Sequence, residues 1–261
     1  MINGAGTTLT ITSSTLNGAL ENRGTLVTRQ PTTVLNGTLT NQAGASWRVE
    51  GGIGGSAVVT LSGAATNHGT LDLTSVGGNA QAILGGAGPL INATDGSIRV
   101  LPGTGGERHL ATPLDNQGTV TTTYPLYVDN GSGSYINEAS GTIQANDDIV
   151  VTQTGASPSF SNQGTINLAA AHTISVSGGT FSNSGTVVGG TLALTSLAVN
   201  ASLGMVNPAG TTLVLFATTL SGSLENRGLL VAHQANTVNG TLTNQAGATL
   251  RAEGSRAPPD S

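Results

Sequence analysis

The segment LNGALENRGTLVTRQPTTVLNGTLTNQAGASWRVEG, residues 16–51, decides the fold because it contains one short motif twice. In each copy an apolar residue and one further residue precede Asn, and Gly follows closely, as in Leu20-Glu21-Asn22-Arg23-Gly24 and Leu39-Thr40-Asn41-Gln42-Ala43-Gly44. The apolar residue and the Asn lie two positions apart, and mostly polar residues stand between and after them. This alternation is typical of a half-buried β-strand.

The motif recurs along the whole chain. The mean spacing of its Asn residues is (244 − 22)/10, about 22 residues, and the residue two positions before each Asn is apolar in every copy. The motif residues are Asn22, Asn41, Asn67, Asn92, Asn116, Asn137, Asn162, Asn183, Asn207, Asn226 and Asn244.

A repeat of about 22 residues is shorter than an immunoglobulin-like sandwich or a propeller blade and matches one coil of a parallel β-helix. We therefore expect an all-β, single-stranded, right-handed parallel β-helix (β-solenoid) of about 11 coils, since parallel crossovers are nearly always right-handed. We expect one continuous solenoid over residues 1–254 and a short polar C-terminal tail over 255–261.

The recurring Asn residues are predicted to have a structural role. If one Asn occupies the same turn in each coil, its amide donates to and accepts from the Asn residues above and below, which forms a hydrogen-bonded ladder along the axis. The alternative is a solvent-facing Asn that stabilises its own turn.

Residues 16–51 closely match residues 220–254, with a single one-residue gap. Charged residues repeat with the match, each separated from its partner by one residue. They are either a solvated outer face or complementary contacts between stacked ends. These residues are Glu21 with Arg23, Arg48 with Glu50, Glu225 with Arg227, and Arg251 with Glu253.

The Asn-x-Gly-Thr-Leu units and the phrase Leu39-Thr40-Asn41-Gln42-Ala43-Gly44 resemble the repeats of bacterial secreted β-helix exoproteins. These are the filamentous-haemagglutinin-like adhesins and the passenger regions of autotransporters. The resemblance covers the chain from about Leu16 to Gly254 and is one of repeat style. It implies a right-handed β-helix, export to the bacterial cell surface or beyond, and an adhesive or structural role.

Composition excludes several other classes of protein. The chain of 261 residues has no Cys, and its eight basic residues are all Arg, so disulfides, thiol catalysis and lysine chemistry are excluded. A net charge of −5 argues against nucleic-acid binding. No apolar run has the length of a transmembrane helix.

The titratable residues do not form a recognisable catalytic motif. Asp147 and Asp148 are adjacent and are expected in a turn, and four further aspartates are expected on solvated loops or the outer face: Asp72, Asp95, Asp115 and Asp129. The histidines lack metal-binding spacing: His68, His109, His172 and His233. We therefore expect no catalytic, cofactor or metal site, and a non-enzymatic protein.

Residues 149–224 contain no Asp, Glu, Lys or Arg, although an average protein carries such residues at about a quarter of positions. This neutral segment is either drift in a low-charge repeat or a surface for lateral packing on another copy, a glycan or a cell surface. Hydroxyl rows such as Thr121-Thr122-Thr123 leave an ice-binding solenoid open as well.

The function that these features favour is a structural or adhesive extracellular rod that stacks end to end, because open β-helix ends expose unpaired strand edges. The chain would be a head-to-tail filament subunit or a segment of a longer exoprotein. The alternatives are a polysaccharide-binding or polysaccharide-degrading β-helix and an ice-binding solenoid.

Overall fold

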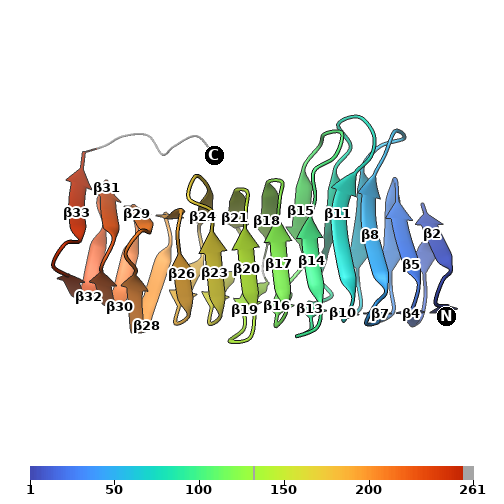
Figure 1. Cartoon of the computed structure of the whole chain (residues 1–261), viewed down its shortest axis with the longest axis horizontal. Coiled ribbons are helices and arrows are strands. Elements are labelled where there is room, and N and C mark those ends of the chain that lie inside the picture. Colours follow the sequence, from blue (N-terminus) through green and yellow to red (C-terminus); the bar gives the residue numbers. More distant parts are fainter. Residues whose placement is uncertain (132, 255–261) are drawn as a thin grey trace.

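The computed structural model describes residues 1–131 and 133–254, which form an elongated rod of stacked β-strands (Figure 1). No helix long and apolar enough to cross a membrane occurs in these ranges. The strands belong to three sheets that run the length of the rod, and strands pair in parallel within each sheet. The tail predicted at 255–261 lies outside the described residues.

Sheet A has twelve strands and contains the Asn motif. They are β1 (Ile2–Asn3), β4 (Leu20–Asn22), β7 (Leu39–Asn41), β10 (Ala65–Asn67), β13 (Leu90–Asn92), β16 (Leu114–Asn116), β19 (Ser134–Asn137), β22 (Ser159–Asn162), β25 (Thr180–Asn183), β28 (Ala198–Asn207), β30 (Thr219–Asn226) and β32 (Thr237–Asn244).

Sheet B has nine strands and ends before the last three coils. They are β2 (Thr8–Thr12), β5 (Thr25–Arg29), β8 (Ser46–Gly51), β11 (Thr70–Ser75), β14 (Ser97–Val100), β17 (Thr119–Thr122), β20 (Thr142–Ala145), β23 (Thr165–Leu168) and β26 (Thr186–Val188).

Sheet C has twelve strands. They are β3 (Thr15–Leu16), β6 (Thr32–Leu35), β9 (Ala57–Leu61), β12 (Ala82–Gly86), β15 (Arg108–Ala111), β18 (Leu126–Asn130), β21 (Ile149–Gln153), β24 (Thr173–Ser177), β27 (Thr191–Thr195), β29 (Thr212–Phe216), β31 (Leu229–His233) and β33 (Thr249–Glu253).

The prediction of a parallel β-solenoid is confirmed, with twelve coils where the Asn spacing indicated eleven. Each of the first nine coils contributes one strand to each sheet. The last three coils instead combine one long strand of sheet A with one strand of sheet C. The additional coil is the first, whose Asn3 also carries the motif, in Met1-Ile2-Asn3 with Gly6.

Apolar side chains of successive coils stack inside the rod. In sheet A, Leu20, Leu39, Ala65 and Leu90 pair in register and are almost fully buried. Burial alternates along each short strand because successive side chains point to opposite faces. Full burial of one such Leu side chain contributes about 1.5–3 kcal/mol to folding, so the core column is a main source of stability.

Glycine is required where coils approach closely at the turn after the Asn. A Cβ on Gly69 would lie 2.2 Å from the Ala45 carbonyl oxygen of the preceding coil, so a larger residue does not fit. In the longer form of the motif, Gly44 instead has a φ of 79°, a conformation that Gly adopts at little cost. These two constraints explain why the motif always includes Gly.

Candidate functional site

The motif Asn residues are brought together as a ladder inside the rod. In ten pairs, the Nδ2 of one Asn donates to the Oδ1 of the Asn in the next coil, over 2.6–2.8 Å. The donor–acceptor pairs are Asn3–Asn22, Asn22–Asn41, Asn41–Asn67, Asn67–Asn92, Asn92–Asn116, Asn116–Asn137, Asn137–Asn162, Asn162–Asn183, Asn207–Asn226 and Asn226–Asn244.

Every ladder amide other than those of Asn183 and Asn244 also bonds to the backbone of the following coil. Asn67 is typical: its Nδ2 donates to Asn92 Oδ1 and to the Ser97 carbonyl oxygen at 3.2 Å, and its Oδ1 accepts from Asn41. The side chain is fully buried, so these bonds satisfy polar atoms that would otherwise be costly to bury. The ladder therefore fixes the register of each coil on the next.

The ladder is interrupted once, between Asn183 and Asn207. The sequence spacing predicted that these two residues would be neighbours in one ladder, and this is wrong. Strand β28 pairs with β25 through Ser182 and Asn200, so the following residue, Ala201, occupies the position over Asn183. The register of β28 then shifts between Ala201 and Met205, and a second Asn ladder begins at Asn207, which precedes a strand of sheet C, whereas Asn183 precedes a strand of sheet B.

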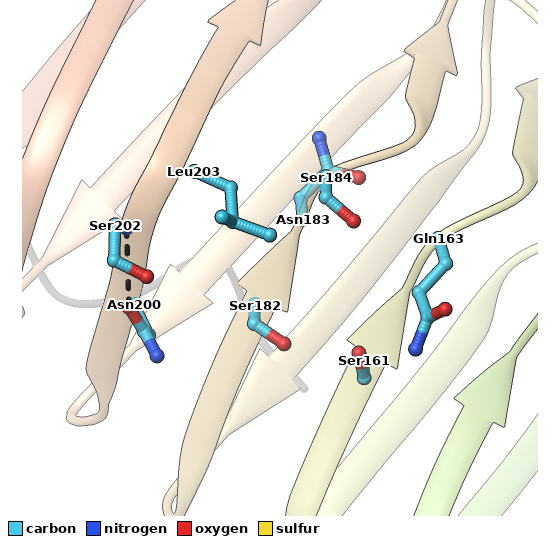
Figure 2. Close-up of a pocket in the computed structure, with 8 residues that line it drawn as sticks. All are labelled: Ser161, Gln163, Ser182, Asn183, Ser184, Asn200, Ser202 and Leu203. Carbon is cyan, nitrogen blue, oxygen red and sulfur yellow. Dashed lines mark hydrogen bonds between the residues drawn. The ribbon is translucent and has the colours of Figure 1, made fainter.

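A shallow recess of about 290 Å³ lies at this interruption, within the charge-free segment (Figure 2). Its lining is neutral and mostly hydroxyl or amide, and only Leu203 is apolar. The residues are Ser161, Gln163, Ser182, Asn183, Ser184, Asn200, Ser202 and Leu203. Leu203 lies on the bulge of β28 and is 83% exposed.

Two of the repeated charge pairs lie on the surface of the second and eleventh coils. Arg23 Nε donates to Glu21 Oε1 at 2.8 Å, and Arg227 Nε donates to Glu225 Oε1 at 2.9 Å. Each Arg lowers the pKa of its Glu, chiefly through this hydrogen bond. In each pair, both residues belong to the same copy of the duplicated segment. Neither pair lies in a terminal coil of the rod.

The other two repeated pairs differ from one another in burial. Of the two alternatives for these pairs, a solvated outer face is wrong for Glu50, because its side chain is only 1% exposed. Arg48 Nη2 lies 2.7 Å from Glu50 Oε2, and Arg29 Nη2 lies 2.5 Å from Oε1. Oε1 accepts no hydrogen bond in this geometry, so its contact with Arg29 is electrostatic. In the duplicate, Arg251 pairs with Glu253 on the last coil.

Asp72 is also buried, against the expectation of an exposed loop or outer-face residue. It lies in register with Arg99 of the next coil, whose Nε and Nη2 donate to both carboxylate oxygens at 2.7 and 2.8 Å. This bond raises the pKa of Arg99. Coils lie only about 4.8 Å apart, so the long side chain of an Arg on a neighbouring coil reaches over the shorter Asp side chain and shields its carboxylate from solvent.

The histidines lie beside carboxylates. Three of them contact a carboxylate of the following coil: His68 with Asp95 at 2.9 Å, His109 with Asp129 at 2.6 Å, and His233 with Glu253 at 3.4 Å. His109 Nε2 also lies 3.0 Å from Glu107.

The fourth histidine, His172, contacts the adjacent aspartates of the preceding coil. Asp147 and Asp148 lie in the turn between β20 and β21, as expected. One ligand atom each of His172, Asp147 and Asp148 lies within 4.8 Å of the others. Sequence spacing could not reveal this cluster, because His172 is one coil away.

Arg108 is a residue that the sequence reasoning did not single out. It is fully buried, and its guanidinium donates to the carbonyl oxygens of Leu101, Gly105 and Gly106. It also lies 4.6 Å from the centroid of the Tyr124 ring. Burial lowers its pKa. Arg108 therefore fastens the loop between β14 and β15 to the rod.

The two end coils are exposed along the rod axis. All residues of β32 are exposed, as are most residues of β33, and at the other end Ile2 is 60% exposed. The ladder also ends here: Asn244 Nδ2 donates to Ala248 of its own coil at 3.2 Å.

Comparison of the chain with protein-family models, curated proteins and solved structures found no match. The parallel β-solenoid therefore stands on the structure alone, and the resemblance to bacterial exoproteins remains one of repeat style.

Proposed function

We propose that this chain is a non-enzymatic structural or adhesive rod of the bacterial cell surface or extracellular space, and that its terminal coils stack end to end on a second copy. The rod shape, the repeat style of exported β-helix exoproteins and the open strand edges at both ends support this function.

The observation that carries the proposal is the different burial of near-identical segments. Leu39, inside the rod, is 2% exposed, but its counterpart Leu242 in the last coil is 36% exposed. Trp47 is 1% exposed, but its counterpart Leu250 is 48% exposed. In the inner copy, β10 and β11 of the next coil cover these residues, whereas no described residue covers their counterparts in the last coil.

The first coil of a second copy fits as this cover. Its Asn3 Oδ1 would accept from Asn244 Nδ2, which continues the ladder in the direction that it has within the rod. The same register places Leu9 of the second copy over Leu250, so β2, a sheet B strand, would stack on β33, a sheet C strand. Each Asn bond made between copies would resemble those made between coils.

Charge does not oppose this contact. Residues 1–20 contain no Asp, Glu, Lys or Arg, and in the last coil Arg251 and Glu253 neutralise one another. A head-to-tail contact of this kind is heterologous, so it propagates as an open polymer.

Sedimentation velocity tests the proposal. Across a series from about 1 to about 200 µM, we expect the weight-average sedimentation coefficient to rise steadily, because assembly follows mass action. A single species of monomer mass at every concentration would contradict end-to-end stacking.

A further inference from the structure

We propose that the recess at the ladder interruption, bounded by Asn183, Asn200 and Leu203, is a binding site for a neutral polyhydroxylated ligand, namely a stretch of uncharged oligosaccharide. This site is on the side of the rod and is independent of the contact between ends.

The first argument is an amide donor that no acceptor of the described residues meets. Asn183 is 4% exposed, and its Oδ1 accepts from Asn162 at 2.6 Å. In the preceding coils, each Nδ2 finds the Asn of the next coil. Asn183 Nδ2 has no acceptor among the described residues, because Ala201 follows it in the column.

Asn183 Nδ2 is not an enclosed atom, so solvent reaches it. Asn183 lines the recess, so a hydroxyl or carbonyl oxygen of a ligand can supply the missing acceptor there. Within the rod, before the last coil, Asn183 is the ladder residue whose Nδ2 meets no other Asn among the described residues.

The second argument is the chemistry of the wall. Ser161, Ser182 and Asn200 stand in register on three successive coils, so they present a short row of groups that both donate and accept. Such a row matches the hydroxyls of a sugar chain, which also donate and accept. Figure 2 shows Asn200 and Leu203 on one strand, facing the serines of the neighbouring strands.

The third argument concerns what the recess excludes. It lies in residues 149–224, which contain no Arg or Lys to hold a phosphate, sulfate or uronate group and no Asp or Glu to hold a cation. Leu203 is 83% exposed and provides an apolar surface for the C–H face of a sugar ring. The ligand is therefore neutral, with both polar and apolar faces.

The probes for a test are cellohexaose, xylohexaose, laminarihexaose and chitohexaose, titrated into the whole protein by isothermal calorimetry. We expect at least one to bind. Leu203→Ala and Asn200→Ala should each weaken that binding by about tenfold, because both residues are at the surface of the recess. Asn183→Ala should abolish it, with circular dichroism used to check that this variant is folded.

The matched control is Gln117→Ala. Gln117 follows the ladder residue Asn116 as Gln163 follows Asn162, but it lies outside the recess, so this variant should bind like the unmodified protein. Hexagalacturonate, a charged comparator, should not bind.

Three results would overturn the proposal. These are no binding of any neutral hexasaccharide, binding by the Leu203→Ala and Asn200→Ala variants that is as tight as that of the unmodified protein, or a loss of self-association in those variants without sugar. The last result would identify the recess as a lateral contact between copies. End-to-end assembly is measured by a separate experiment. A failure of the sugar-binding proposal therefore leaves the stacking proposal unaffected, and a failure of the stacking proposal leaves the sugar-binding proposal unaffected.

Discussion

Asn116 Nδ2 donates to Asn137 Oδ1 at 2.7 Å, although the two residues lie 21 positions apart in the chain. Both side chains are buried, and Asn116 in turn accepts from Asn92. This single relationship, repeated from coil to coil, links the sequence motif to the stability of the rod.

Asn116→Ala should therefore destabilise the rod by about 2–4 kcal/mol, because it removes two buried hydrogen bonds, leaves Asn92 and Asn137 with unsatisfied atoms and creates a cavity. The control is Asn36→Ala. Asn36 donates to Asn17 at 2.9 Å with the same chemistry, but on the exposed surface. Urea denaturation compares the two variants. Equal midpoints would contradict the claim that burial makes the ladder hydrogen bonds important for stability.

Glu50→Gln should destabilise the rod by about 2–3 kcal/mol, because it removes a buried carboxylate that neutralises Arg29 and Arg48. Glu21→Gln should have no measurable effect, since Glu21 makes a similar contact with Arg23 on the exposed surface. Thermal melting of the two variants measures the difference. A shift of similar size in both would contradict the burial argument.

We expect the folded rod to lose stability at high pH because of Tyr135. It is buried and donates to the Leu110 carbonyl oxygen at 2.6 Å, and burial, followed by the charge of Asp129, raises its pKa well above the ordinary value. Since the unfolded chain loses this proton near pH 10, the stability due to Tyr135 is present below that pH and lost as the pH rises above it.

Tyr135→Phe should abolish this part of the pH dependence, at a cost of about 1–3 kcal/mol near neutral pH for the unsatisfied Leu110 oxygen. Urea denaturation from pH 8 to about 11 tests it. The chain has no Lys or Cys, so tyrosines dominate titration in this range. Parallel curves for the two proteins would contradict the assignment.

Particular residues show how much of this structure the sequence could predict. The Asn motif and its apolar neighbour predicted the coil and its length, because both are local requirements of every turn. The interruption after Asn183 could not be predicted, since Asn207 keeps the motif and only the bulge in β28 displaces it. The burial of Glu50 and Asp72 depends on Arg side chains of adjacent coils, and so on a register that no local pattern reveals.

Leu250→Pro should block assembly at the C-terminal end. The Thr249 N–H donates backward to Gly228 at 2.9 Å, so the N–H of Leu250, the next residue, points toward the open end. Proline removes this donor and places its ring in the contact, yet an edge strand tolerates it. Leu250→Ala shortens the same side chain but keeps the donor. Sedimentation should show assembly reduced more strongly in the proline variant, and equal assembly in the two would contradict pairing through this edge.

The lengths of the particles in negative-stain electron micrographs test the central claim of end-to-end stacking most directly. Twelve coils at about 4.8 Å each give a subunit about 58 Å long. The account predicts straight rods of constant width whose lengths are integer multiples of this value, with the mean rising with concentration. Rods of one subunit length at every concentration would contradict it, as would side-by-side bundles of single rods.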